Sequence, residues 1–132
     1  MSEAAVKLAR DALKALSRGD LAALTDLSHE EVEWQSFFAA LGQGGTYRGH
    51  DGLRQYMNDL SDAFDFIHAE VDDDIAVGDV VLLLGRVHYR GKESGVEQEL
   101  PAGWVLKVRQ DKIVRFRAFR EPESALEAVG SG

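Results

Sequence analysis

The feature that most constrains the fold of this chain is a change of hydrophobic period near its middle. Over residues 4–16 and again over residues 53–64, apolar side chains recur at three- and four-residue steps. From residue 71 to residue 120, apolar and polar side chains mostly alternate. The first spacing is typical of an amphipathic helix and the second of a half-buried strand. Helices followed by a run of antiparallel strands predict an α+β fold, with the helices on one face of a sheet.

Glycine and aspartate residues limit the predicted elements of the first half. Gly19 ends the first helix, and Asp20 is placed to cap a short second helix, because its carboxylate can accept a hydrogen bond from a free backbone amide. A short strand is predicted over residues 31–34, and a third helix begins near Asp51. The glycine-rich loop at residues 42–45 lacks the Gly-Lys-Ser/Thr ending of a phosphate loop, so no nucleotide site is predicted there.

Turns divide the second half into strands. Strands are predicted over residues 71–77, 80–90, 96–109 and 112–120. Pro101 cannot donate a hydrogen bond to a strand ladder, so we expect it at an edge or a bulge. Pro122 suits the first turn of a closing helix over residues 123–129, where its missing amide is not needed. Residues 1–130 are expected to form one domain, with residues 131–132 as a tail.

Composition excludes several partners. The formal net charge is −8, which disfavours binding to nucleic acid or to an anionic membrane, because such surfaces attract basic stripes. The absence of cysteine excludes disulfides and thiolate metal sites. His29, His50 and His68 lie on separate elements without the spacing of a metal site, so no metal is predicted. No cofactor is expected, and residues 1–14 lack the apolar run of a signal peptide, which favours a cytoplasmic protein.

Short sequence words, in order along nearly the whole chain, resemble a known superfamily. They include "SRGDLAALTDL", "VEW", "TYRGHDGLRQYM", "VGDVVLLLGRVHYRGKESGVEQE" and "QDKIVRFRAFREPESALEAVG". The chain resembles the SnoaL-like branch of the nuclear transport factor 2-like superfamily. This resemblance implies a cone: a strongly curved antiparallel sheet wrapped around the N-terminal helices, with an internal pocket. Members include cyclases, isomerases, hydrolases, dehydratases and non-catalytic binding proteins, so residues must decide the function.

The acid/base members carry one carboxylate on the first strand and another on a central strand. In this chain the first position falls around Trp34 and Gln35, and the second around Trp104 and Val105. Neither position holds an acid. The chain therefore departs from the pattern that the resemblance implies for acid/base catalysis.

Aromatic side chains are the candidate ligand-binding residues, because each offers a large apolar face and some carry one polar group. Packing in the core or at the rim is the alternative interpretation of each. The candidates are Trp34, Tyr47, Tyr56, Trp104, Phe116 and Phe119.

His88 is the candidate for acid/base chemistry, since an imidazole titrates near neutrality. Alternation along its strand places it on the same face as Leu82 and Leu84. The alternative is a partly exposed histidine at a strand end with no role in catalysis.

Three functions remain open, and whether the protein is an enzyme is not decided by the sequence. The first is a pocket protein that binds a small, largely apolar molecule, a class that includes polycyclic compounds. The second is a cofactor-independent cyclase, isomerase or hydratase that uses His88 for proton transfer. A purely structural or protein-binding module is a third possibility, and the identity of the ligand or substrate is not specified by any motif.

A homodimer through the outer face of the sheet is also expected. The superfamily commonly dimerises there, and residues 80–84 are apolar on both faces. The alternate set Val81, Leu83, Val87 and Tyr89 would otherwise face water.

Overall fold

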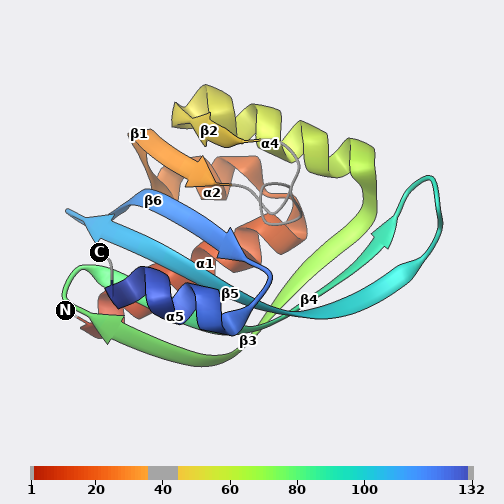
Figure 1. Cartoon of the computed structure of the whole chain (residues 1–132). Helices are drawn as coiled ribbons and strands as arrows, with labels where there is room; N and C mark the ends of the chain where they lie inside the picture. Colours follow the sequence, from red (N-terminus) through yellow and green to blue (C-terminus); the bar gives the residue numbers. More distant parts are fainter. Residues whose placement is uncertain (1, 36–44, 131–132) are drawn as a thin grey trace.

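A computed structural model describes residues 2–35 and 45–130, and within them the elements follow the predicted order (Figure 1). The helices are α1 (Ser2–Arg18), α2 (Leu21–Leu27), α4 (Gly49–Ala63) and α5 (Pro122–Gly130). The strands are β1 (Ser28–Gln35), β2 (Thr46–Arg48), β3 (Phe64–Val77), β4 (Val80–Gly91), β5 (Glu97–Arg109) and β6 (Lys112–Phe119). The predicted α+β class is confirmed. The glycine-rich loop falls outside the described residues except for Gly45.

The strands of the described residues form one curved, unclosed sheet in the order β2-β1-β6-β5-β4-β3. All neighbouring strands run antiparallel except β1 and β6, which are parallel. The predicted antiparallel sheet is present, and β1 and β6 add one parallel pair that the sequence did not indicate. Helices α1, α2 and α4 lie on one face of the sheet and α5 lies on the other, in front of β4 and β5 in Figure 1. We call these the inner face and the outer face.

The inner face holds the main core, and strand alternation decides which side chains enter it. Leu83 and Val87 of β4 are buried there with α1 and α4, and Tyr89 packs against the same core. The expectation that Val81, Leu83, Val87 and Tyr89 face outward is wrong. The apolar run 80–84 has two buried faces because the chain itself covers both.

The outer face is covered in part by α5. Leu82 and Val105 are buried beneath Ala125 and Ala128 of this helix. Gly103 permits the close approach, because a Cβ at this position would lie 2.6 Å from the Cβ of Ala125. The closing helix thus acts as a second cover for the sheet.

The cap that the sequence predicts for α2 is present. The backbone N–H of Ala23 donates to Oδ1 of Asp20 at 3.0 Å, and Gly19 turns the chain between the helices with a φ of +68°. This hydrogen bond lowers the pKa of the Asp20 carboxyl, and Arg18 adds to the effect. The short helix α2 can therefore follow α1 directly, with an acceptor for a backbone N–H of its first turn.

The strand β3 starts earlier than predicted. Phe64 continues the apolar stripe of α4 in the sequence but is the first residue of β3 in the structure. The register of β3 against β4 shifts between Val71 and Asp73. A Cβ at Gly85, opposite this bulge, would lie 1.8 Å from the carbonyl oxygen of Glu70, so glycine is required there.

Pro101 lies in the part of β5 that has a partner on one side only. It pairs with Arg86 of β4, whereas the pairing of β5 with β6 begins at Gly103. The predicted edge position is confirmed. Among residues 2–35 and 45–130, no helix has both the length and the apolar character needed to cross a lipid bilayer.

Candidate functional site

An apolar cavity lies between the inner face of the sheet and helices α1 and α4. Its volume is about 30 Å³, which is enough for about one or two water molecules. Its walls come from α1, α4 and four strands of the sheet. The lining residues are Leu13, Leu16, Ser17, Tyr56, Leu60, Ile67, Ala69, Val87, Trp104, Phe116 and Ala118.

Ser17 brings a hydroxyl group into this apolar lining. It lies in the last turn of α1, and its Oγ accepts a hydrogen bond of 3.0 Å from the backbone N–H of Ala69. Ala69 belongs to β3, which is the edge strand of the sheet, so this amide has no strand partner on that side. Ser17 therefore ties α1 to the edge of the sheet beside the cavity.

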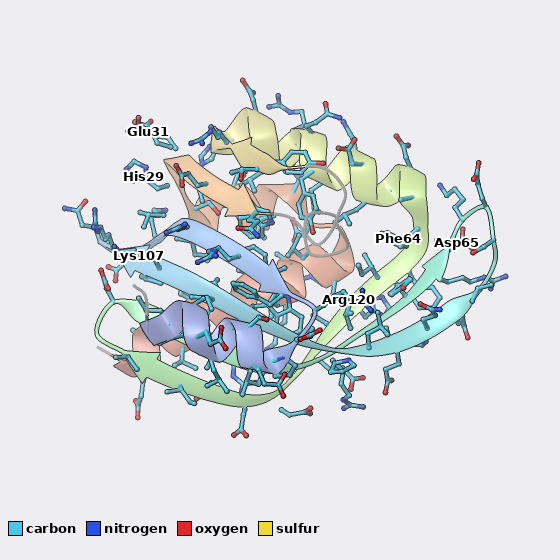
Figure 2. All side chains as sticks on the ribbon, viewed as in Figure 1. His29, Glu31, Phe64, Asp65, Lys107 and Arg120 are labelled. Carbon is cyan, nitrogen blue, oxygen red and sulfur yellow. The ribbon has the colours of Figure 1, made fainter. Side chains whose placement is uncertain are left out.

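A groove of about 310 Å³ opens on the surface next to the cavity. It lies where the ends of α1 and α4 meet the start of β3, and Figure 2 labels Phe64 and Asp65 in its wall. The groove and the cavity share four lining residues, which are Leu16, Ser17, Leu60 and Ile67. Among the described residues, these side chains lie at the junction of the two spaces.

An aromatic row runs across the inner face behind the cavity. Tyr47 of β2, Trp34 of β1 and Phe116 of β6 are neighbours in strand register. The rings of Trp34 and Phe116 stack with centroids 3.9 Å apart and planes 6° from parallel. Tyr56 of α4 completes the group, with its ring centroid 5.1 Å from that of Tyr47. This packing fixes the side of the cavity formed by Phe116 and Tyr56.

Tyr47 does not line the cavity, and a hydrogen bond fixes the position of its side chain. Its hydroxyl donates to Oδ2 of Asp59, and Nε2 of Gln55 donates to the other carboxylate oxygen of Asp59. Burial of the phenol, together with the hydrogen bond to Asp59, raises the pKa of Tyr47 to about 12. The phenol therefore stays protonated at neutral pH.

Trp34 is fully buried, and its indole Nε1 has no hydrogen-bond partner among the described residues. A buried donor without a partner is uncommon in native structures, since it loses its hydrogen bond to water without replacement. Trp34 does not line the cavity, but it packs on Phe116, which does.

The structure brings together half of the aromatic residues that the sequence offered. Tyr56, Trp104 and Phe116 line the cavity, whereas Trp34 and Tyr47 lie behind this layer. Phe119 is on the outer face, where it packs with the residues under α5. Its assignment to the pocket is contradicted by strand alternation, since positions 116 and 119 of one strand face opposite sides.

His88 lies on the outer face of β4. The predicted alternation is confirmed, because His88 shares its face with Leu82 and Leu84, while Val87 lines the cavity. His88 pairs across the sheet with His68 and Glu99, and its ring centroid is 5.2 Å from that of Phe66. This face is not the cavity face. His88 therefore lacks the contact with the cavity that a role in proton transfer there requires.

Sequence reasoning missed the aliphatic part of the lining and Ser17. Leu13, Leu16 and Ser17 follow the helical period of α1, so a helical-wheel argument could have placed them on the inner face. Ile67 and Ala69 could not be found in this way, because their segment was not predicted as a strand.

A curved sheet around N-terminal helices, with an apolar cavity between them, defines the nuclear transport factor 2-like class of α+β cones. The sequence profile of the SnoaL-like domain matches residues 9–116, and the chain belongs to this family. No curated protein sequence matches the chain.

Solved structures share the fold at low sequence identity. One is a nuclear transport factor 2-like protein of unknown function from Burkholderia pseudomallei, with a TM-score of 0.79 and 19% identity over 94% of this chain and 95% of that one. A second is TerC, co-crystallised with polyporic acid, with a TM-score of 0.78 and 18% identity over 96% and 98% of the two chains. A third is a putative polyketide cyclase from Xanthomonas campestris, with a TM-score of 0.77 and 20% identity over 97% and 98%.

Proposed function

We propose that the protein binds a small, largely apolar molecule in the cavity between α1, α4 and the inner face of the sheet. The observation that carries this proposal is the cavity itself, which has aromatic walls from Tyr56, Trp104 and Phe116. Apolar, enclosed spaces with a few placed polar groups are typical of small-molecule sites. TerC, which has the same fold, was crystallised with polyporic acid, and this supports an organic ligand for such a cone.

The cavity is smaller than an organic ligand, so binding requires side chains to move. Leu16, Leu60 and Ile67 stand between the cavity and the groove of about 310 Å³. The proposal requires that rotation of these side chains joins the two spaces. The proposal therefore predicts that the bound state is a wider form of the same site.

Thermal unfolding with an apolar probe tests the proposal. Butylbenzene should raise the melting temperature of the wild-type protein in a concentration-dependent way, because it binds the folded state only. It should also change the fluorescence of Trp104, which lines the cavity. Absence of any effect up to the solubility limit of butylbenzene, and of a wider panel of apolar compounds, would contradict the proposal.

A pair of matched variants locates the site. Ala118→Val adds two methyl groups to the cavity wall and should weaken butylbenzene binding by about tenfold. Ala102→Val places the same groups on the inner face of β5, outside the cavity lining, and should leave affinity unchanged. Equal effects of the two substitutions would show that the probe binds elsewhere.

We further propose that two copies associate through the outer face, on grounds that differ from those the sequence offered. Ile75 and Val77 of β3 are 44% and 55% exposed, and Leu126 of α5 is 48% exposed. Ile75 and Val77 pair with Leu82 and Val80, at the margin of the area that α5 covers. An apolar margin of this kind is suited to a self-complementary contact about a two-fold axis.

A further inference from the structure

Ser17 stands at the junction of the cavity and the groove, since it lines both. The other three residues at this junction are aliphatic. A molecule that extends from the cavity into the groove therefore passes the Ser17 hydroxyl, which is the one polar side chain among the described residues that line both spaces.

The hydrogen bonds of Ser17 leave its proton available. A serine hydroxyl has one donor and two acceptor positions. The N–H of Ala69 occupies one acceptor position, and no acceptor among the described residues takes the Ser17 proton. Thr25 in α2 shows the usual alternative, because its hydroxyl donates to the carbonyl oxygen of Leu21 one turn earlier. Ser17 has no such bond to its own helix.

The surroundings of the groove select the charge of the group that can accept this proton. Helix α1 ends at Arg18 and α4 ends at Ala63, so the carbonyl ends of two helices approach the groove. Helix C-termini carry partial negative charge. The charged side chains of the wall are already paired, since Arg18 lies 3.4 Å from Asp20 and Asp65 lies 3.4 Å from Arg90. Around the Ser17 hydroxyl the other shared lining residues are aliphatic, so a carboxylate bound there would lose its hydration in exchange for a single donor. A neutral acceptor is therefore favoured over a carboxylate.

We infer that the ligand is an uncharged amphiphile whose carbonyl-type oxygen accepts a hydrogen bond from Ser17. Its apolar body, a ring or a branched chain, occupies the cavity against Trp104 and Phe116, and the remainder extends into the groove. This inference rests on the proposed function and adds the chemical class of the ligand and its orientation. Such a ligand requires one hydrogen-bond donor at the junction of the cavity and the groove, and apolar contact within the cavity.

Two probes that differ only at one position test the inference. Butyrophenone carries a carbonyl group where butylbenzene carries a methylene, so the ratio of their dissociation constants isolates the acceptor. We expect Ser17→Ala to reduce the preference for the ketone by about fivefold, the value of one neutral hydrogen bond. Ser17→Thr keeps the hydroxyl and should keep the preference. A third probe, 4-phenylbutyrate, should bind more weakly than the ketone.

The ratio of the two dissociation constants separates recognition of the ligand from the stability of the protein. Ser17→Ala also removes the acceptor of the Ala69 N–H, and both probes experience this loss equally. Ser61→Ala changes a groove residue outside the cavity lining and should leave the ratio unchanged. If Ser17→Ala leaves the ratio as in the wild type, or if the carboxylate binds best, the inference is overturned while the pocket remains. If neither neutral probe binds the wild type, both the inference and the proposed function fail.

Discussion

At the scale of single residues, two aspartate carboxylates accept hydrogen bonds from different kinds of donor. Asp20 is exposed and caps α2, whereas Asp59 holds a phenol from a neighbouring strand. The first acts on the backbone of its own segment and was visible in the sequence. The second joins residues that only the fold brings together.

Replacement of Asp20 by alanine should lower the melting temperature, because the N–H of Ala23 loses its acceptor. Asp20→Asn retains an oxygen acceptor and should behave much like the wild type. The pKa of Asp20 is lowered in the folded state, so its stabilisation is present above the ordinary pKa of 3.8 and is lost as the pH falls through the lower folded-state value. Thermal unfolding as a function of pH measures both effects, and equal melting temperatures for the wild type and Asp20→Ala would contradict the cap.

Tyr47 should titrate later than an ordinary tyrosine. Its pKa is raised from 10.0 to about 12 in the folded protein, so the folded state holds this proton more tightly than the unfolded state. The associated stability is complete below pH 10 and is lost as the pH rises from 10 to 12. Alkaline titration followed by tyrosinate absorbance should show a late component that disappears in Tyr47→Phe. A wild-type titration without that component would rule out the shift.

At the scale of elements, the bulge in β3 makes the neighbouring strand depend on one glycine. Gly85→Ala should reduce the free energy of unfolding by about 3 kcal/mol, because the new Cβ would clash with a backbone oxygen that cannot rotate away. Gly45→Ala is the matched control, since no described atom lies within 4 Å of its added Cβ. Urea denaturation of the two variants gives the comparison, and similar losses would refute the packing of β3 on Gly85.

The elements that the sequence predicts well are those whose signals are local. The period of α1, the cap at Asp20 and the turn at Gln110 and Asp111 each depend on neighbouring residues, and all are present. The start of β3 was not predictable in this way. Phe64 extends a helical stripe, and only pairing with β4 makes the segment after it a strand.

The candidate site was predictable only in part for a related reason. Alternation correctly sorted β4 into two faces but could not say which face the N-terminal helices would cover. The short helix α5 buries Leu82 and Val105 on the outer face, so an apolar side chain was no guide to the cavity. Tyr56, Trp104 and Phe116 were found because large aromatic side chains fill such interiors in most arrangements.

At the scale of the whole molecule, the exposed apolar margin beside α5 predicts a dimer. Light scattering at micromolar concentration should give twice the mass of the 14.5 kDa chain. Val77→Asp should yield the single-chain mass, because it places a charge in the contact. Val96→Asp is the matched control, since Val96 is similarly exposed at 52% but lies next to the turn between β4 and β5. A wild-type mass of 14.5 kDa at every concentration would exclude this assembly.

Because β1 pairs with β6, the sheet can form in full only late in the synthesis of the chain. Gln35 and Arg117, which are hydrogen-bonded across this pair, are 82 residues apart in the chain. Closing so long a segment is entropically costly and makes folding slow compared with local contacts. Until β6 has left the ribosome, β1 has no partner on that side, and Trp34 lacks the ring on which it stacks. The nascent N-terminal half therefore carries an open strand edge for most of translation, which is the interval in which a chaperone would bind it.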